Sequence, residues 1–330
     1  MSPRVSVVTP FYNTAEYLEE CIRSVLAQSF ADFEYVLLDN CSNDGSRRIA
    51  ERFATLDRRI RLISNPGHLT QVQNYNAALT AISPHSEYCK MVQADDWLFR
   101  RCLEEMVTLA DSHPEIGIVS SYRLAGTAVK EVGLPHTSVV TPGREICRKQ
   151  MLEGLHFFGS PSTILVRSSL IRAREPFYEE GRMHEDTEAC YDVLDRHQFG
   201  FVHQVLSFTR TDNDSIMSRS RTFGPGLLDK LIIVRRFGPR YLDDAEYRLC
   251  RLDHEAAYLR FLGEALLRPQ GRDFWDYQRR GWKQIGYRPS RLRLACSAAG
   301  ALADLVLNPK RTLDRAFRSL RRRLASTARV

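Results

Sequence analysis

The chain has 330 residues, of which 43% are hydrophobic and 26% are charged, so its composition is that of an ordinary globular protein and excludes extensive disorder. The formal net charge of +7 does not indicate nucleic-acid binding, because residues 288–330 hold eleven Lys and Arg against two Asp and leave 36 basic and 38 acidic residues in 1–287. Eight scattered cysteines, with no Cys-x-x-Cys pair and no secretory leader, predict small core residues in the reducing cytoplasm.

The first half of the chain alternates apolar strands with amphipathic helices. A strand is predicted over residues 5–9 and is expected to end at Pro10, and Asn13 with Glu16 predicts a capping box for the next helix. Further strands are predicted over 35–39, 60–63 and 88–92. Three further helices are predicted: one that carries Ile49 and Phe53, one near 70–82 and one near 99–112. This order predicts an α/β fold with a parallel sheet and a ligand site at the carboxyl ends of its strands.

Acidic side chains follow two of these predicted strands. Asp39 ends one of them, and Asp95 and Asp96 leave another as a pair. Tandem carboxylates suit Mg²⁺ or Mn²⁺, which prefer oxygen ligands, although a solvated turn that caps the following helix is the alternative interpretation. The chain has neither a G-x-G-x-x-G after the first strand nor a G-x-x-x-x-G-K-[ST], so a phosphate bound at this edge would need a metal.

Six segments between roughly residues 4 and 220 together resemble family 2 glycosyltransferases of the GT-A fold, in the order found in that family. The segments are Val5-Ser-Val-Val-Thr-Pro-Phe-Tyr-Asn13, Ser24-Val-Leu-Ala-Gln-Ser-Phe30, Val36-Leu-Leu-Asp-Asn-Cys-Ser-Asn-Asp-Gly-Ser46, Asn74-Tyr-Asn-Ala-Ala-Leu79, Gln93-Ala-Asp-Asp-Trp-Leu98 and Glu185-Asp186. The resemblance implies a GT-A catalytic domain over residues 1–220, with a Rossmann-like, mostly parallel sheet flanked by helices. It also implies inverting transfer of a sugar from a nucleotide-diphosphate donor.

The resemblance implies a nucleotide site at the ends of the first two strands. Thr9, Pro10 and Tyr12 match the backbone and ring that surround the base and ribose. Asp39 matches a carboxylate that accepts a hydrogen bond from the base, commonly the N3–H of uracil, which favours a UDP-sugar donor. The alternative interpretation of Asp39 is a cap for the turn at 40–45.

The resemblance also implies a metal site, with two departures from the family pattern. Asp95 matches the last position of an Asp-x-Asp motif, but Gln93 replaces the first Asp. Metal binding would therefore depend on Asp95 with help from Asp96. The amide of Gln93 could instead bind a ribose hydroxyl. Further along, Arg210 matches an arginine that contacts phosphate. Asp212 stands where the family often has a metal-binding His, and aspartate is a competent ligand for Mg²⁺ or Mn²⁺.

Glu185-Asp186 matches the Glu-Asp pair that contains the family's general base, and this match assigns the role of base to Asp186. Inversion requires a carboxylate on the face of the sugar opposite the leaving group, where it takes the proton of the acceptor hydroxyl. The alternative interpretation is the acidic first turn of a helix that runs toward Leu194. The two interpretations are compatible.

Residues 221–330 are predicted to be mainly helical and to end in a basic amphipathic tail. The apolar stretch 294–307 is too short to span a membrane. Beyond it an apolar stripe lies opposite arginines, which predicts either a helix on the anionic inner face of the membrane or a helix packed on the protein's own core. The residues of the stripe are Leu313, Phe317, Leu320 and Leu324, and the arginines are Arg315, Arg318 and Arg322.

Two functional hypotheses follow from the sequence. The first is a metal-dependent hexosyltransferase that transfers a sugar from a UDP-sugar to a hydroxyl of a glycan or lipid-linked saccharide. It would be cytoplasmic or peripheral on the membrane and would act in the synthesis of cell-surface polysaccharides or glycoconjugates. The second, motivated by Gln93 and Asp212, is a non-catalytic relative that binds a nucleotide sugar or glycan as a sensor or assembly subunit. No nucleic-acid partner is expected, because the one aromatic residue among the arginines at 311–323, Phe317, belongs to the apolar stripe, and no series of aromatic side chains is interleaved with these arginines.

Overall fold

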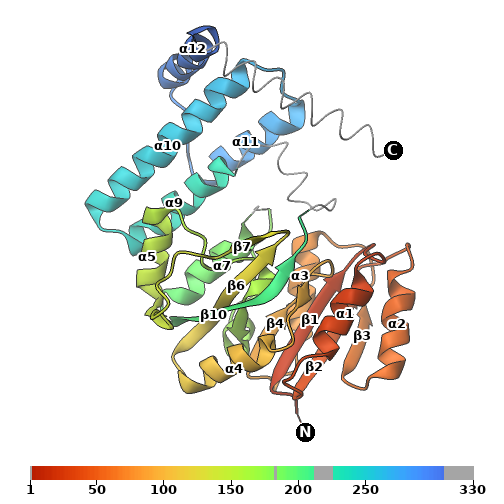
Figure 1. Ribbon diagram of the computed structural model, residues 1–330. Helices are drawn as coiled ribbons and strands as arrows, with labels where there is room; N and C mark the ends of the chain where they lie inside the picture. Colours follow the sequence, from red (N-terminus) through yellow and green to blue (C-terminus); the bar gives the residue numbers. More distant parts are fainter. Residues whose placement is uncertain (1, 182–183, 212–225, 308–330) are drawn as a thin grey trace. The chain divides into compact units, whose positions relative to one another are not determined.

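The computed structural model describes residues 2–181, 184–211 and 226–307. It divides into two compact units, Met1–Asn213 and Asp214–Val330. The first unit contains a sheet flanked by helices, and the described part of the second unit is helical (Figure 1). Each unit is described by itself below.

The sheet of the first unit combines parallel and antiparallel strands in the order β3-β2-β1-β4-β9-β6-β10-β5, with β7 paired to β6 and β8 to β10. Strands β1 to β4 pair in parallel, β9 is antiparallel to both β4 and β6, and β6 is parallel to β10. The strands are β1 (Val5–Phe11), β2 (Phe33–Asp39), β3 (Ile60–Ser64), β4 (Tyr88–Met91), β5 (Trp97–Leu98), β6 (Ile116–Ala125), β7 (Ala128–Lys130), β8 (Val140–Pro142), β9 (Leu165–Arg167) and β10 (Gln198–Thr209).

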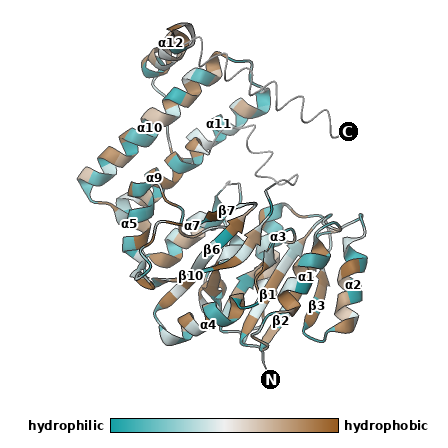
Figure 2. Ribbon diagram, viewed as in Figure 1, coloured by the Kyte–Doolittle hydropathy of each residue, from teal (hydrophilic) through white to brown (hydrophobic). Residues whose placement is uncertain are grey.

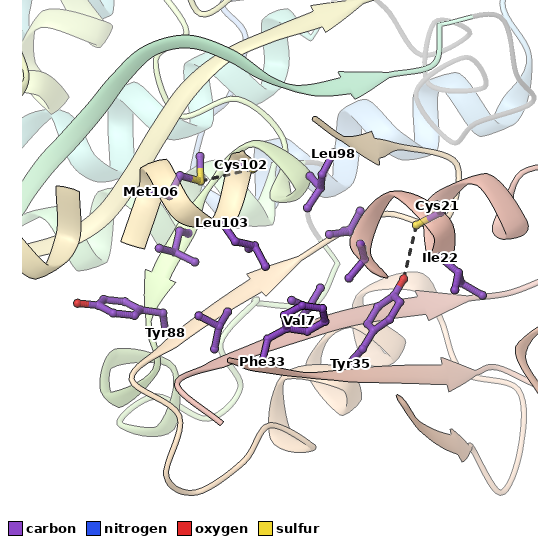
Figure 3. Close-up of a cluster of buried hydrophobic side chains, with 14 of the residues drawn as sticks. Val7, Cys21, Ile22, Phe33, Tyr35, Tyr88, Leu98, Cys102, Leu103 and Met106 are labelled. Atoms are coloured by element: carbon purple, nitrogen blue, oxygen red, sulfur yellow. Dashed lines mark hydrogen bonds between the residues drawn. The ribbon is translucent and has the colours of Figure 1, made fainter. Parts of the chain in front are cut away.

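Helices cover the sheet and contribute side chains to its buried core. They are α1 (Leu18–Leu26), α2 (Ser46–Leu56), α3 (Gln71–Thr80), α4 (Cys102–Ser112), α5 (Gly143–Glu153), α6 (Ser168–Arg172) and α7 (Glu185–Leu194), with a 3₁₀ turn η1 at Pro161–Thr163. Figure 3 shows Ile22 of α1 and Leu103 of α4 in one buried cluster with Val7 of β1 and Phe33 of β2. The predicted α/β class is confirmed.

Strand β1 does not end at Pro10, although the sequence predicted that it would. The strand continues through Pro10 to Phe11. The Val8 carbonyl accepts a bond from Val92, next to β4, and the Phe11 carbonyl accepts one from Asn40, next to β2. Successive residues of a strand alternate in direction, so the Pro10 nitrogen faces the β4 side, beyond the last β1–β4 pair, and no ladder bond is lost.

The predicted capping box at Asn13 is also wrong. Helix α1 begins at Leu18 and its N-cap, Tyr17, makes no side-chain cap. Asn13 has a φ of 50°, and its side-chain oxygen accepts a hydrogen bond from the Asn43 backbone N–H at 2.9 Å. Asn13 therefore ties the loop after β1 to the loop after β2 instead of starting a helix.

All eight cysteines are free thiols, but they do not all lie in the core. Six are buried, and Cys41 and Cys296 are exposed, so the prediction of core positions is wrong for these two. Cys41 lies in the turn that follows β2 and has a φ of 64°.

The described part of the second unit consists of α9 (Leu227–Tyr241), α10 (Asp244–Leu266), α11 (Arg272–Gln284) and α12 (Arg291–Leu307). A second buried cluster includes Leu231, Tyr258 and Leu262. The helices carry both hydrophilic and hydrophobic segments, as amphipathic helices do (Figure 2). In the described residues, no helix combines the length and the apolar character that crossing a membrane requires. The predicted stripe at 313–324 lies outside the described residues.

The core can be tested with one leucine in each of two helices of the first unit. Leu103 of α4 is completely buried, whereas Leu56 at the end of α2 is 75% exposed. We expect Leu103→Ala to lower the free energy of unfolding by about 2–5 kcal/mol, because it leaves a cavity, and Leu56→Ala to change it by less than about 0.5 kcal/mol. Urea denaturation measures both, and equal losses would contradict the described packing.

Candidate functional site

The carboxyl ends of β1, β2 and β4 meet at one edge of the sheet. The parallel register places Phe11 beside Asp39 and Val8 beside Met91. The residues that follow these positions therefore leave the sheet together. Among the sequence-predicted site residues, this topology gathers Thr9, Pro10, Tyr12, Asp39, Gln93, Asp95 and Asp96 at this edge.

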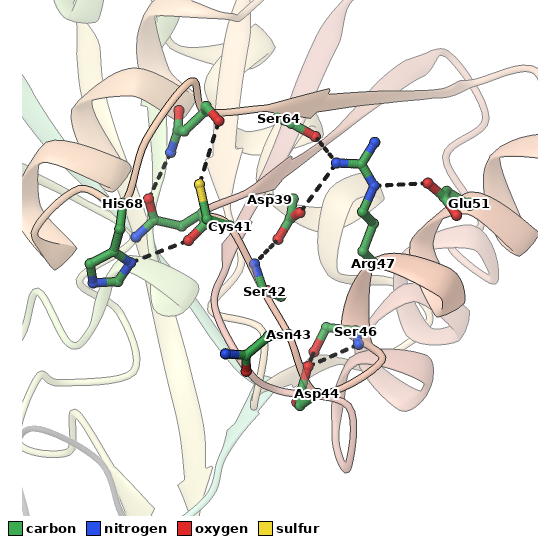
Figure 4. A network of polar contacts seen from close by, with 12 residues as sticks. Asp39, Cys41, Ser42, Asn43, Asp44, Ser46, Arg47, Glu51, Ser64 and His68 are labelled. Atoms are coloured by element: carbon green, nitrogen blue, oxygen red, sulfur yellow. Dashed lines mark hydrogen bonds and ion pairs between the residues drawn. The ribbon is translucent and has the colours of Figure 1, made fainter.

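Asp39 ends β2 and is only 1% exposed. Its Oδ1 accepts a hydrogen bond from the Ser42 backbone N–H at 2.9 Å, and its Oδ2 lies 3.8 Å from Arg47 Nη1 (Figure 4). The first contact shows that Asp39 does cap the turn after β2. Among the described residues the Oδ2 atom makes only this long ion pair, so it keeps the capacity to accept a stronger hydrogen bond.

Aromatic rings lie beside this turn. The ring of Tyr12 is 42% exposed, and its centroid lies 4.4 Å from that of His68. The His68 Nδ1 atom is 3.3 Å from the Asn40 carbonyl oxygen, and the Asn40 side chain bonds both the N–H and the carbonyl of Leu69 at 2.9 Å. His68 and Asn40 are site residues that the sequence analysis did not select, because no local motif links two separate loops.

Thr9 contributes to the core rather than to the open edge. It is completely buried, and its hydroxyl lies 3.0 Å from the hydroxyl of Tyr35. Figure 3 shows the same Tyr35 hydroxyl beside the Cys21 thiol of α1, which donates to the Gln93 carbonyl at 3.6 Å. The side chain of Thr9 therefore helps to position α1 and Gln93 and does not reach the open edge.

Gln93 is held by two elements. Its backbone N–H donates to Ser162 Oγ of η1 at 2.9 Å, and its side-chain Nε2 donates to the Tyr75 hydroxyl of α3 at 2.8 Å. Gln71 donates to the same hydroxyl at 2.7 Å. These contacts leave the Gln93 Oε1 as the atom that could accept a bond from a ribose hydroxyl.

The acidic pair consists of one buried and one half-buried carboxylate. Asp96 is 2% exposed, and its Oδ2 accepts a hydrogen bond from Thr209 at the end of β10 at 3.3 Å. Burial, and then the charge of Asp95, raise the pKa of Asp96 to about 7, although hydrogen bonds from Ser162 and Thr209 oppose this shift. The alternative of a helix cap is wrong, because β5 intervenes and Arg101 is the N-cap of α4.

The acidic pair fits a hard divalent cation. Among the described residues no group of three His, Cys, Asp or Glu side chains could hold a metal, and the predicted ligand Asp212 lies outside them. Mg²⁺ is commonly bound by only one or two carboxylates and completes its shell with water and substrate phosphates. A cation between Asp95 and Asp96 would also relieve the repulsion that raises the pKa of Asp96.

Arg210 follows β10 and already has a partner in this structure. Its guanidinium group pairs with the Glu20 carboxylate of α1 and lies 4.7 Å from the centroid of the Tyr17 ring. Among the residues that the structure describes, its buried Nε has no hydrogen-bond partner. A phosphate at this position would compete with Glu20 for Arg210.

Glu185 and Asp186 lie in the first turn of α7, together with Glu188. The helix dipole stabilises carboxylates at this end, so the interpretation as an acidic first turn is confirmed. The Asp186 Oδ1 accepts a hydrogen bond from the Thr187 backbone N–H at 2.6 Å. Burial raises the pKa of Asp186, against the charge of His184 and the hydrogen bonds from Thr187.

Two tyrosines connect α7 to the sheet edge. The rings of Tyr75 and Tyr178 lie 6.3 Å apart. Burial raises the pKa of the Tyr75 hydroxyl, and the charges of both Asp95 and Glu185 raise it further, so both carboxylates lie near this hydroxyl. Burial and the charge of Asp186 likewise raise the pKa of Tyr178. The charges of the acidic pair and of the Glu185-Asp186 pair therefore both act on these two tyrosines.

Sequence comparison relates the chain to bacterial glycosyltransferases. It is 28% identical to EpsE of Bacillus subtilis strain 168, a candidate glycosyltransferase, over 70% of this chain and 81% of EpsE. It is 30% identical to the glycosyltransferase GlyG of Streptococcus pneumoniae serotype 4 over 37% of this chain and 40% of GlyG.

Solved structures share the fold. TarS of S. aureus, residues 1–349, in complex with UDP-GlcNAc, matches 91% of this chain and 89% of its own with a TM-score of 0.63 and 16% identity. The mannosyltransferase PcManGT of Pyrobaculum calidifontis, in complex with GDP-Man and Mn²⁺, matches 92% of this chain and 88% of its own with a TM-score of 0.54 and 17% identity. These matches confirm the predicted GT-A fold.

A protein-family model provides the assignment. The model for glycosyl transferase family 2 matches residues 6–174, which is half of the chain and includes Asp39 and the acidic pair. This match, together with the relatives and the shared fold, confirms the resemblance inferred from the sequence motifs. The chain belongs to glycosyl transferase family 2.

Proposed function

We propose that this family 2 glycosyltransferase is inverting and metal-dependent, and that it moves a sugar from a UDP-linked donor to a hydroxyl of a glycan or lipid-linked saccharide. The observation that carries the proposal is the meeting of Asp39, Asp95 and Asp96 at one edge of the sheet. Tyr75 bonds Gln93 at that edge and contacts Tyr178, whose pKa the charge of Asp186 raises. The complex of TarS with UDP-GlcNAc supports the choice of donor class.

The donor would bind across the ends of β1, β2 and β4. Asp39 Oδ2 would accept the N3–H of uracil, with the exposed ring of Tyr12 beside the base. The Oε1 of Gln93 would accept a hydrogen bond from a ribose hydroxyl, because Tyr75 already holds the amide nitrogen. These contacts would leave the diphosphate next to the acidic pair.

The diphosphate carries the charge that the site must neutralise. Mg²⁺ or Mn²⁺ bound to Asp95 and Asp96 would neutralise the negative charge of the leaving diphosphate. Arg210 would add a fixed positive charge once it is released from Glu20. Hydrogen bonds from Thr209 and Ser162 orient Asp96 and favour its ionised form against the effects of burial and the charge of Asp95.

Asp186 would act as the general base. It would take the proton of the acceptor hydroxyl while that oxygen forms a bond to C1 of the donor sugar. At the same time the bond between C1 and the diphosphate oxygen would break, and the diphosphate would depart with the electron pair. A raised pKa brings a carboxylate closer to the working pH and makes it a stronger base. The hydrogen bond from Thr187 fixes its orientation.

Asp186→Asn tests the assignment of the base. We expect it to lower the turnover number by about 10²–10⁴-fold and to leave UDP affinity nearly unchanged, because an amide cannot accept the proton. A matched control on the same helix is Asp192→Asn, whose carboxylate pairs with Arg174, and it should retain turnover. Full turnover by Asp186→Asn, measured by UDP release, would refute the assignment.

The metal site should depend on pH through Asp96. Its carboxyl has a pKa of about 7, and a cation binds the deprotonated form, so protons compete with metal. We expect Mn²⁺-dependent UDP binding to weaken as the pH falls below about 7, approaching tenfold per pH unit. Calorimetric titration between about pH 6 and pH 8 measures this effect. A UDP affinity that does not change over that pH range would contradict it.

The pairing of Arg210 with Glu20 predicts that removing the charge of Glu20 increases the affinity for UDP. We expect Glu20→Gln to strengthen UDP binding by about two- to fivefold, because the diphosphate would no longer compete with an exposed ion pair of modest strength. Glu19→Gln is the matched control, since Glu19 pairs with Arg23 and Arg52. Equal affinities of the two variants would show that Arg210 does not contact the diphosphate.

A further inference from the structure

The helical unit contains a cavity of about 250 Å³ that the proposed reaction does not use. It lies between α9, α10 and the turn that joins α11 to α12, and all its lining residues belong to this unit. Figure 1 shows these helices in the blue-green to blue part of the chain. The lining includes three arginines, Arg235, Arg288 and Arg293, from three separate segments.

The cavity has an excess of positive charge. Glu255 is the acidic residue in its lining, and it is already engaged by Arg235 Nη2 at 2.7 Å and Arg251 Nη1 at 2.9 Å. Burial acts to raise the pKa of Glu255, but the hydrogen bonds from Arg235 and Arg251 outweigh it and lower this pKa. Glu255 is therefore ionised and shared by two guanidinium groups, and Arg288 and Arg293 add two further positive charges.

Arg235 is held in place before any ligand arrives. Its guanidinium carbon lies 4.7 Å from the centroid of the Tyr287 ring, and its Nη2 is fixed by Glu255. Because Glu255 and the Tyr287 ring fix its guanidinium group, Arg235 is already oriented at the cavity wall.

The start of α12 adds to the positive potential. The helix has 17 residues and begins at Arg291, directly after Ser290 of the cavity lining. Ser290 Oγ accepts a hydrogen bond from the Arg293 backbone N–H at 3.4 Å. Both Arg288 and Arg293 are exposed and flank this helix start, where the partial positive charge of the helix dipole favours anions.

The chemistry of the lining selects a small anion with several oxygen atoms. Guanidinium groups form paired hydrogen bonds with phosphate oxygens, and the cavity is smaller than the roughly 300–1,000 Å³ usual for larger organic ligands. We propose that this cavity binds a phosphate or diphosphate group through Arg235, Arg288 and Arg293. The group is either a free anion or the phosphorylated head of a lipid or saccharide.

Inorganic pyrophosphate is the direct probe. We expect the full chain in EDTA to bind it saturably by calorimetry, and Arg288→Gln combined with Arg293→Gln to weaken binding by at least about tenfold. The matched control, Arg268→Gln combined with Arg272→Gln, removes the same charge from exposed positions of the same unit and should preserve binding. Asp95→Ala should also preserve it, because the acidic pair belongs to the other unit.

Three results would overturn the proposal: no saturable binding at millimolar pyrophosphate, equal binding by the Arg288/Arg293 double variant, or loss of binding in Asp95→Ala. Flotation with vesicles of phosphatidic acid or phosphatidylcholine distinguishes the sources of phosphate. If vesicles with phosphatidic acid capture the protein, and if both added pyrophosphate and the double substitution abolish this capture, the ligand is a lipid phosphate. Pyrophosphate binding without such capture supports a free anion or a soluble phosphorylated saccharide.

Discussion

The parallel pairing of β1 with β2 on one side and β4 on the other is the constraint on which the site depends. Because the three strands run in the same direction, each must release its chain at the same edge. Polar residues that follow the strands, Asp39 and the segment 93–96, are thereby brought together although more than fifty positions separate them. The loops that leave this edge are then tied to each other through Asn13, Asn40 and His68.

This edge carries an electrostatic cost that a ligand would relieve. Asp96 is buried beside Asp95, and its pKa of about 7 reflects both burial and repulsion. On the same segment Lys90 is completely buried, donates to the Met106 sulfur at 3.6 Å, and has a pKa lowered by burial. Charged groups are seldom buried without close partners, and such arrangements are concentrated at functional sites.

The sequence predicted the elements that run continuously through the core and failed where the fold depends on distant contacts. The apolar runs of β1, β2 and β4 were evident because a central parallel strand is covered on both faces. The apolar run at 163–166 predicts a strand, and β9 forms there, but no local signal gives its antiparallel place between β4 and β6. Its position follows from tertiary packing, which a local pattern cannot express.

The candidate site shows the same division. Asp39, Asp95 and Asp186 were found through motifs, because each follows a strand or starts a helix in a recognisable segment. The partners that set their environment were not found: Tyr75 holds Gln93 from α3, Thr209 bonds Asp96 from β10, and Glu20 occupies Arg210. These partners come from separate parts of the chain, and only the folded sheet brings them into contact.

The measurement that tests the account most directly is calorimetric titration of the purified protein with UDP, GDP and dTDP, each with Mn²⁺ and with EDTA, repeated on Asp95→Ala. The account predicts that UDP binds with Mn²⁺, that EDTA removes most of this binding, and that Asp95→Ala removes the part that depends on metal. Binding of no diphosphate under any condition, or UDP binding that neither EDTA nor Asp95→Ala changes, would contradict a metal-dependent donor site at this edge of the sheet.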